Sequence, residues 1–346
     1  MNKSVLRADL LLLLTAAVWG FGFVAQRSGM QYVGPFTFNG IRFILASLSL
    51  LPIIALNKSK TNCTKTSSSS PVTIGTSGFR AQFLAASLLS GTCLFIAVSI
   101  QQLGMMATTA GNAGFITGLY VVFTPILGIF FGRKTGKATW VGAFLMLTGL
   151  YFLSTQGPFE GINPGDIIIV ISAVFWAFHV LIIDRLVQKN DPLAISSGQF
   201  AVTGIFSLIA AFLLEPHLSS WLETNGSDFL SSGLFYWKSF PALIEGFGDG
   251  TVPTSLITNA LIPILYGGLV SVGIGYTLQA VAQRHAPPAH ATIILCLEGG
   301  FAALGGILIL HEPVGSRIII GFALALTGML ASQWELIKGH QKNVHL

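Results

Sequence analysis

The apolar stretch PPAHATIILCLEGGFAALGGILIL, residues 287–310, carries one acidic side chain, Glu298, close to its midpoint. A carboxylate at the centre of a membrane helix opposes insertion by roughly 3 kcal/mol, whereas each Leu, Ile or Phe favours it by about 0.5 kcal/mol. Ten such apolar residues lie between Ile293 and Leu310, so the stretch inserts in spite of the acid. An ionisable group inside a membrane normally faces a bundle interior or a wet cavity, which makes Glu298 a functional candidate.

The composition of the whole chain is that of a polytopic membrane protein. Of its 346 residues, 52% are hydrophobic and only 9% are charged, and the mean hydropathy is +0.74, values that exclude an ordinary soluble domain. The apolar runs are about 20 residues long, as membrane helices are, and do not alternate as barrel strands do. The 39 glycines suit helices that approach one another closely in lipid. The three cysteines indicate no disulfide framework.

We expect an all-α fold with ten transmembrane helices, because ten apolar runs are long enough to cross about 30 Å of hydrocarbon. The first run follows two basic residues and superficially resembles a signal peptide, but it contains Trp19 and is too long, so we interpret it as a retained helix. Two long connections, residues 57–79 and 215–256, are predicted to be solvated loops. The ten runs are residues 8–25, 38–56, 80–103, 106–131, 138–154, 165–186, 194–214, 257–283, 287–310 and 316–337.

An internal repeat relates the two halves of the chain. Matches in the early helices of each half keep one constant shift, and matches in the late helices keep another. We therefore expect a first five-helix repeat over residues 1–155 and a second over residues 156–346. Because five is odd, the two repeats must have opposite orientations in the membrane. The outermost matched pairs are Asp9 with Asp166, Pro35 with Pro192, Ala107 with Ala286, and Gly149 with Gly328.

The placement of basic residues predicts which side each loop occupies. Fourteen of the eighteen Lys and Arg residues lie on the side of the N-terminus, so both termini and the loop 57–79 are expected in the cytoplasm and the loop 215–256 outside. The net charge of +5 is therefore a topology signal and does not indicate a nucleic-acid partner. Arg42 is one of the four remaining basic residues, and we expect its side chain to extend to the outer interface.

Inverted repeats place a binding site near the membrane midplane, between the halves, so matching helices should contribute to it. In the first helix of the second half, Ser172, Trp176 and His179 lie on one face. Their counterparts in the first half include Thr15 and Trp19, so one polar and aromatic stripe is present twice. The alternative is that these side chains only pack and hydrogen-bond helices.

Four more polar side chains on membrane helices join the candidate binding residues. Taken singly, each is more easily explained as a hydrogen-bonding contact between helices, worth about 0.6 kcal/mol in a membrane protein. Together with Glu298 they make a polar set that a transport pathway needs. They are Asn112, Tyr120, Tyr276 and Gln279.

Motifs of soluble enzymes are missing from the sequence. His311-Glu312 begins like a zinc-binding helix, but the position that needs the second histidine is Gly315. No nucleophile elbow, phosphate-binding loop or cysteine ligand pair is present, so we expect no catalytic residues, no metal and no cofactor. A membrane-embedded enzyme remains an alternative, with His179 and Glu298 as its catalytic pair.

Short motifs in both halves resemble the EamA-type drug/metabolite transporter superfamily, and the resemblance covers nearly the whole chain. In two positions the sequence departs from the family: a Glu-Pro-Val sequence is replaced by Glu298-Gly299-Gly300, which makes that helix more pliable, and the hairpin glutamate of the first half is replaced by Arg133. The motifs are AVWG at 17–20, IRF at 41–43, TP at 124–125, LE at 297–298, FAALG at 301–305, HEP at 311–313 and the glycine-bounded segment 321–328.

The resemblance implies a secondary transporter that exports or exchanges small metabolites such as amino acids through a central cavity. Its expected partners are a small-molecule substrate, protons and the lipid bilayer; a homodimer is compatible with the sequence. We expect an integral protein of a bacterial inner membrane with both termini cytoplasmic. A channel-like facilitator is the nearest alternative.

The topology prediction can be tested by labelling Ser68→Cys and Ser231→Cys with a membrane-impermeant maleimide, each in a background without the three native cysteines. We expect Ser231→Cys to react in intact cells, and Ser68→Cys to react only after permeabilisation, because basic loops remain cytoplasmic. The opposite labelling pattern would reverse the orientation.

Overall fold

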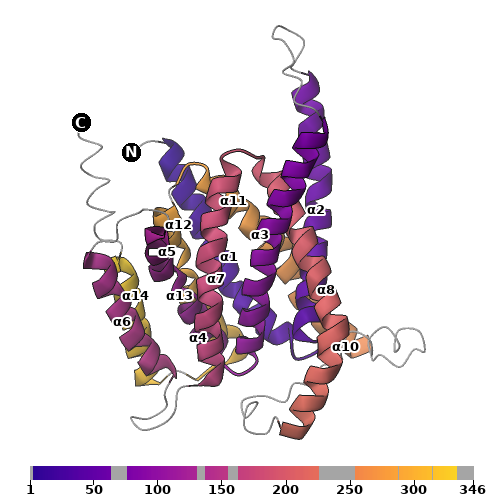
Figure 1. The fold of residues 1–346 in the computed structure, drawn as a ribbon. Coiled ribbons are helices and arrows are strands. Elements are labelled where there is room, and N and C mark those ends of the chain that lie inside the picture. The colour runs from indigo at the N-terminus through magenta and orange to yellow at the C-terminus, as the bar shows by residue number, and fades with distance from the viewer. Residues whose placement is uncertain are drawn as a thin grey trace.

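A computed structural model describes residues 3–63, 76–130, 137–154, 163–225, 254–286, 288–313 and 315–332. The regular elements of these residues are helices, gathered in one bundle (Figure 1). Seven of the described helices are long and apolar enough to cross a membrane, and three shorter apolar helices bring the crossings to ten. The all-α fold with ten transmembrane helices is therefore confirmed.

The described part of the first half holds five crossings. The first run of the chain is a helix packed inside the bundle, with Leu12 and Ala16 fully buried. The helical segments are α1 (Lys3–Gly29), α2 (Pro35–Cys63), α3 (Thr76–Met105), α4 (Ala110–Thr117), α5 (Tyr120–Ile129) and α6 (Lys137–Ser154).

The described part of the second half repeats this order, with one crossing distorted. Three consecutive segments make that crossing, and its middle third is a π-helix, a form often found at functional sites. The segments are α7 (Pro164–Val187), α8 (Pro192–Asn225), α10 (Thr254–Leu265), η1 (Tyr266–Tyr276), α11 (Thr277–Gln283), α12 (Pro288–Leu295), α13 (Glu298–Leu310) and α14 (Ser316–Ser332).

Matching helices of the two halves are broken at matching positions. We expected continuous helices over 106–131 and 287–310, but α4 ends at Thr117 and α12 ends at Leu295, and in each case a new segment starts after two intervening residues. Each break contains a tighter bond spanning three residues: Leu119 N donates to Ile116 O at 3.0 Å and Leu297 N to Ile294 O at 3.2 Å. Glu298 is therefore the first residue of a helix rather than the middle of one.

Contacts at one end of the bundle show that the two halves are inverted. The Arg27 side chain at the end of α1 donates to Met105 O at the end of α3, at 3.0 Å. The Asn163 side chain, which caps the start of α7, donates to Ala107 O at 2.8 Å. Thus α7 begins where α1 and α3 end. Since α1 and α7 are repeat counterparts that run in opposite directions, the inverted repeat is confirmed.

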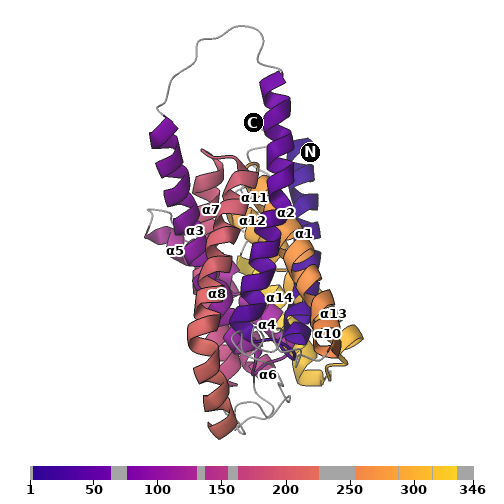
Figure 2. The ribbon, with the colours of Figure 1, turned by 90° about the vertical axis from the view of Figure 1, so that its right-hand side faces the viewer.

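Two helices continue beyond the predicted spans, and the loop boundaries change accordingly. The helix α2 runs to Cys63 and α8 to Asn225, and Figure 2 shows α2 and α3 rising above the rest of the bundle. Glu215, expected in a solvated loop, is fully buried in α8 and accepts hydrogen bonds from the Thr37 backbone N at 2.7 Å and from Thr37 Oγ1 at 2.6 Å. Its carboxylate lies near the N-terminus of α2, where the helix dipole favours negative charge.

The rest of both predicted loops, residues 64–75 and 226–253, lies outside the described residues. Within the described part, α6 packs on α14 at one edge of the bundle (Figure 1), and α1 packs on α13. The remaining large pairings join α2 to α8 and α3 to both α7 and α8. Helices of the first half therefore pack mainly against helices of the second half, which places the bundle centre between the two repeats.

Small residues allow this close packing beside Glu298. A Cβ atom at Gly20 would overlap the Cβ of Phe301 and lie 2.7 Å from Glu298 O, so α1 approaches the backbone of α13 at this point. At Gly300 an added Cβ would meet nothing within 4 Å. Gly20 therefore lies in a tight contact between the two helices, whereas Gly300 of α13 has room for a side chain.

We predict that Gly20→Ala destabilises the folded protein by about 1–3 kcal/mol, the cost of overpacking a tight contact. The matched control, Gly300→Ala, should leave the thermal unfolding midpoint in detergent unchanged or raise it, because Ala favours helix by up to about 1 kcal/mol over Gly. Equal midpoints for both variants would contradict the close packing of α1 on α13.

Candidate functional site

A cavity lies between the two halves, with walls from helices of both. It offers about 30 Å³ to water-sized contents, room for about two water molecules. An amino acid is much larger, so this conformation encloses the site without room for such a solute. The lining residues are Trp19, Phe23, Gln26, Arg42, Gln101, Thr117, Tyr120, Trp176, Val180, Ser271, Tyr276, Gln279 and Glu298.

Aromatic rings form one side of the cavity, and the two repeat-related tryptophans meet there. Tyr276 of η1 lies between them in the ring contacts: its centroid is 4.5 Å from that of Trp19 and 6.0 Å from that of Trp176, to which it is stacked. Trp19 Nε1 donates to Ser271 O at 3.0 Å. Trp176 Nε1 has no hydrogen-bond partner among the described residues. One indole is thus fixed by the protein, and the other has a free donor beside the cavity.

Glu298 supplies the acidic group of the cavity. Its side chain is 3% exposed, and its Oε1 atom forms no hydrogen bond within the described part of the chain. The hydroxyl of Tyr120, across the break in the first half, lies beside the Glu298 carboxyl. Both breaks therefore place a polar side chain at the cavity, as discontinuous helices of transporters do.

Arg42 is the basic group of the cavity, and the sequence interpretation of this residue was wrong. It does not extend to the interface: it is 2% exposed and lines the cavity from α2. Its guanidinium carbon lies 5.5 Å from the centre of the Phe38 ring and 5.0 Å from that of Phe43. The reason is that α2 is covered by α8 and η1, so the arginine points inward. Its distance from the helix start, about two turns, was the available signal.

Six of the ten predicted binding residues line the cavity. They come from both repeats, and four of the six are aromatic, of which Trp19, Trp176 and Tyr276 have ring centroids 4.5 to 6.5 Å apart. These six are Trp19, Tyr120, Trp176, Tyr276, Gln279 and Glu298.

Two predicted residues direct their hydroxyl groups to backbone carbonyls of their own helices, and Thr15 Oγ1 also lies 3.4 Å from Gly275 O of η1. Thr15 Oγ1 donates to Leu11 O at 2.8 Å, and Ser172 Oγ donates to Ile169 O at 2.8 Å. Such back-bonding turns a short side chain toward its own backbone. The structure therefore places both residues behind the cavity wall.

The other two predicted residues also lie away from the cavity. His179 is fully buried, packs edge-on against Trp176 and has its Nε2 atom 3.0 Å from Gln199 Oε1. Its partner is thus an amide on α8. Of the two residues in the enzyme alternative, Glu298 lines the cavity and His179 does not. Asn112 lies in the first turn of α4, where its backbone N donates to Oγ1 of the N-cap residue Thr109 at 3.1 Å.

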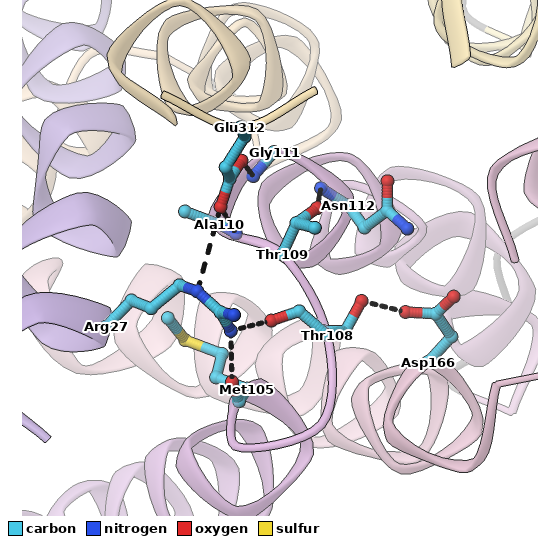
Figure 3. A network of polar contacts seen from close by, with 9 residues as sticks. All are labelled: Arg27, Met105, Thr108, Thr109, Ala110, Gly111, Asn112, Asp166 and Glu312. Atoms are coloured by element: carbon cyan, nitrogen blue, oxygen red, sulfur yellow. Dashed lines mark hydrogen bonds and ion pairs between the residues drawn. The ribbon is translucent and has the colours of Figure 1, made fainter. Parts of the chain in front are cut away.

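Beyond the cavity, a polar network joins the halves at one end of the bundle (Figure 3). Glu312, which follows α13, accepts hydrogen bonds from Ala110 N at 2.7 Å and Gly111 N at 3.2 Å, so it caps α4. Its Oε1 atom is also 3.7 Å from Arg27 Nε, an ion pair with both side chains 13% exposed. A charged group of the second half thus holds two helices of the first.

The same network continues to α7. Arg27 Nη1 donates to the carbonyl oxygens of Met105 and Thr108, and Thr108 Oγ1 donates to Asp166 Oδ1 at 2.5 Å (Figure 3). Four helices are therefore tied together where α1 ends. At the opposite end, bonds between α7 and α11 are longer: Gln188 Nε2 to Gln283 O is 3.5 Å and Arg284 Nε to Val187 O is 3.3 Å.

Comparison with known families identifies the protein class. The EamA-like transporter family matches the chain twice, over residues 6–155 and 163–332. The chain belongs to the EamA-like transporter family. It is a transporter rather than an enzyme, and two matches to one family agree with the repeat seen in the helices.

Curated relatives carry the same description. The chain is 25% identical over 329 residues to an uncharacterized transporter of Archaeoglobus fulgidus, covering 94% of this chain and 85% of the relative. It is 25% identical over 259 residues to the uncharacterized inner membrane transporter YedA of Escherichia coli K12, with 72% and 78% covered, and 21% identical over 314 residues to the uncharacterized transporter YoaV of Bacillus subtilis, with 90% and 91% covered.

A solved structure shares the fold. It superposes with a TM-score of 0.60 at 14% identity and covers 94% of this chain and 96% of its own. Its title, "Crystal structure of protein", names no activity. The likeness extends to nearly the whole EamA-family chain and concerns the fold alone.

We predict that Trp19→Ala and Trp176→Ala each lower solute flux per folded molecule on the order of tenfold, equivalent to about 1.4 kcal/mol, because both rings line the cavity. Trp140→Ala is the matched control, since this indole lies on α6 and is 57% exposed on the bundle exterior. Flux and the amount of folded monomer are measured in the same proteoliposome preparation. Normal flux per molecule with much less folded protein would make the two rings packing residues.

Proposed function

We propose that this EamA-family protein is a secondary carrier that moves a small polar organic solute, such as an amino acid, across the membrane by alternating access. The observation that carries the proposal is the cavity between the inverted halves, where paired tryptophans meet two buried side chains of opposite charge, Arg42 and Glu298. A site at the interface of inverted repeats can open to either side when one repeat rocks against the other. The repeats 1–155 and 156–346 are the units that would move.

The small size of the cavity favours a carrier over a channel-like facilitator. A facilitator needs a continuous path, whereas about 30 Å³ holds no organic solute. The network of Arg27, Glu312, Thr108 and Asp166 closes one end, and its bonds cross between the repeats. Transport would require this network to break while the longer hydrogen bonds at the other end shorten, which is the behaviour of a carrier.

The charge distribution gives the proposed orientation. With both termini cytoplasmic, the closed network lies on the outer side, because α1 ends there. From the family resemblance we propose that the protein exports its solute or exchanges it for protons. The relative named an inner membrane transporter supports a bacterial inner membrane as the location.

Flux in proteoliposomes tests the carrier proposal. Vesicles with purified protein are loaded with unlabelled L-amino acids, and uptake of a labelled L-amino acid mixture is followed. A carrier gives saturable uptake that is accelerated by the internal solutes, since loaded sites return faster than empty ones. Uptake that rises linearly with concentration and is unaffected by internal solutes would identify a facilitator.

Glu298 is the proposed site of proton coupling or of contact with a cationic group on the solute. It is buried at the cavity, and one carboxylate oxygen lacks a partner within the described residues, so adding a proton or a cation there changes the balance of charge between the halves. Two other interpretations remain: a permanently neutral carboxyl that bonds a neighbouring helix, and a fixed pair with another residue.

We predict that Glu298→Gln abolishes the pH dependence of flux while leaving the folded monomer intact, because Gln keeps the shape and hydrogen bonding but cannot titrate. Uptake by wild type and variant is compared from pH 5 to 9, with Glu223→Gln, in the last turns of α8, as the control substitution. An unchanged pH profile in Glu298→Gln would exclude a coupling role.

A further inference from the structure

We propose that Arg42 is the receptor for an anionic group of the transported solute, so that this carrier selects molecules bearing a carboxylate. The inference rests on the proposed function, because it assigns a role within the same cavity. It adds a requirement that a merely polar cavity would not impose: a solute without an anionic group should bind poorly.

The first argument is the burial of a permanent cation. Arg42 is 2% exposed, and arginine remains protonated in proteins, so its charge cannot be removed by titration. Its Nε atom has no hydrogen-bond partner among the described residues, and its guanidinium lies over the rings of Phe38 and Phe43. A buried charge without a counter-ion is costly, and the cost is relieved when an anion occupies the adjacent space.

The second argument is that Glu298 lines the same cavity without neutralising Arg42. In the described part of the chain, no ion pair joins these two side chains, and Glu298 Oε1 is itself without a partner. Tyr276 lies in electrostatic range of both residues. A structural salt bridge would bring the two groups into contact, whereas this arrangement leaves the guanidinium of Arg42 and the carboxyl group of Glu298 separately on the cavity wall, where a ligand can contact either.

The third argument is that the guanidinium is held in place before any ligand arrives. A Cβ at Gly267 of η1 would lie 3.4 Å from Arg42 Cδ and 3.3 Å from Phe38 Cζ, so η1 packs directly on the arginine stem. A fixed planar guanidinium matches the two oxygens of a carboxylate, and such bidentate pairs are stronger than single neutral hydrogen bonds. A Lys at this position would supply the positive charge but not the planar pair of N–H donors.

The alternative is a purely structural role, in which Arg42 stabilises α2 by stacking on the two phenylalanine rings. That role predicts loss of folded protein on substitution, but no change in which solutes compete. The test therefore measures selectivity as well as binding.

The experiment measures quenching of tryptophan fluorescence in purified protein by a mixture of L-amino acids and by the methyl esters of the same amino acids, together with competition by both mixtures in the uptake assay. Wild type should bind the acids at least about tenfold more tightly than the esters, the difference expected for a charge-assisted bidentate contact. Arg42→Lys should retain part of this preference and bind the acids about tenfold more weakly. Arg42→Met, of similar length, should lose the preference, while Arg7→Met, an exposed arginine of α1, should behave as wild type.

The outcomes separate this inference from the carrier proposal. Equal competition by acids and esters in wild type, or an unchanged preference in Arg42→Lys and Arg42→Met, would overturn the role of Arg42 and leave the carrier intact. Selective binding of acids without saturable flux would support Arg42 and overturn the carrier. Absence of saturable quenching by either mixture would overturn the inference. If Arg42→Met does not fold, Arg42→Lys, which retains the positive charge, still tests the role of the guanidinium.

Discussion

Keeping charged side chains out of the lipid is the constraint on which this structure depends. Arg42 and Glu298 are 2% and 3% exposed in a bundle that crosses the membrane, so neither can be left facing lipid tails. The bundle meets this constraint by enclosing both in one cavity between the repeats, with aromatic rings and amide side chains around them. The same enclosure makes the cavity a place where a polar solute can replace water.

Broken helices make this enclosure possible. The turns between α4 and α5 and between α12 and α13 interrupt two crossings at matching positions, and the residues after each break turn polar groups toward the cavity. Backbone irregularity of this kind is tolerated in a membrane only where protein or a water-filled space surrounds it. Gly20 lets α1 cover the second break closely, so packing and the site are linked at one residue.

The two ends of the bundle are held by different chemistry. At one end, carboxylates cap helix N-termini: Glu312 caps α4 and pairs with Arg27, and Glu215 bonds the first turn of α2. At the other end, the bonds between α7 and α11 run to backbone carbonyls at 3.3 and 3.5 Å. Within the described residues, the first end has more charge-assisted hydrogen bonds, and those to the Glu312 and Glu215 carboxylates are as short as 2.7 and 2.6 Å, so this conformation is held more firmly there. In a carrier with alternating access, the contacts that close one end must be similar in free energy to those that close the other end.

The sequence by itself determined the membrane class, the ten crossings, the inverted repeat and six residues of the cavity. Hydropathy, helix length and repeated spacing are visible in the order of the residues, and they decide which segments enter the lipid. Only the tertiary structure decided the rest. Thr15 and Ser172 turned back to their own helices and His179 paired with Gln199, choices made by local hydrogen-bond partners that spacing does not reveal. Arg42 faced inward, and Glu215 was buried, because helices distant in sequence cover them; which side of a helix is covered depends on packing against neighbours that only the folded bundle supplies.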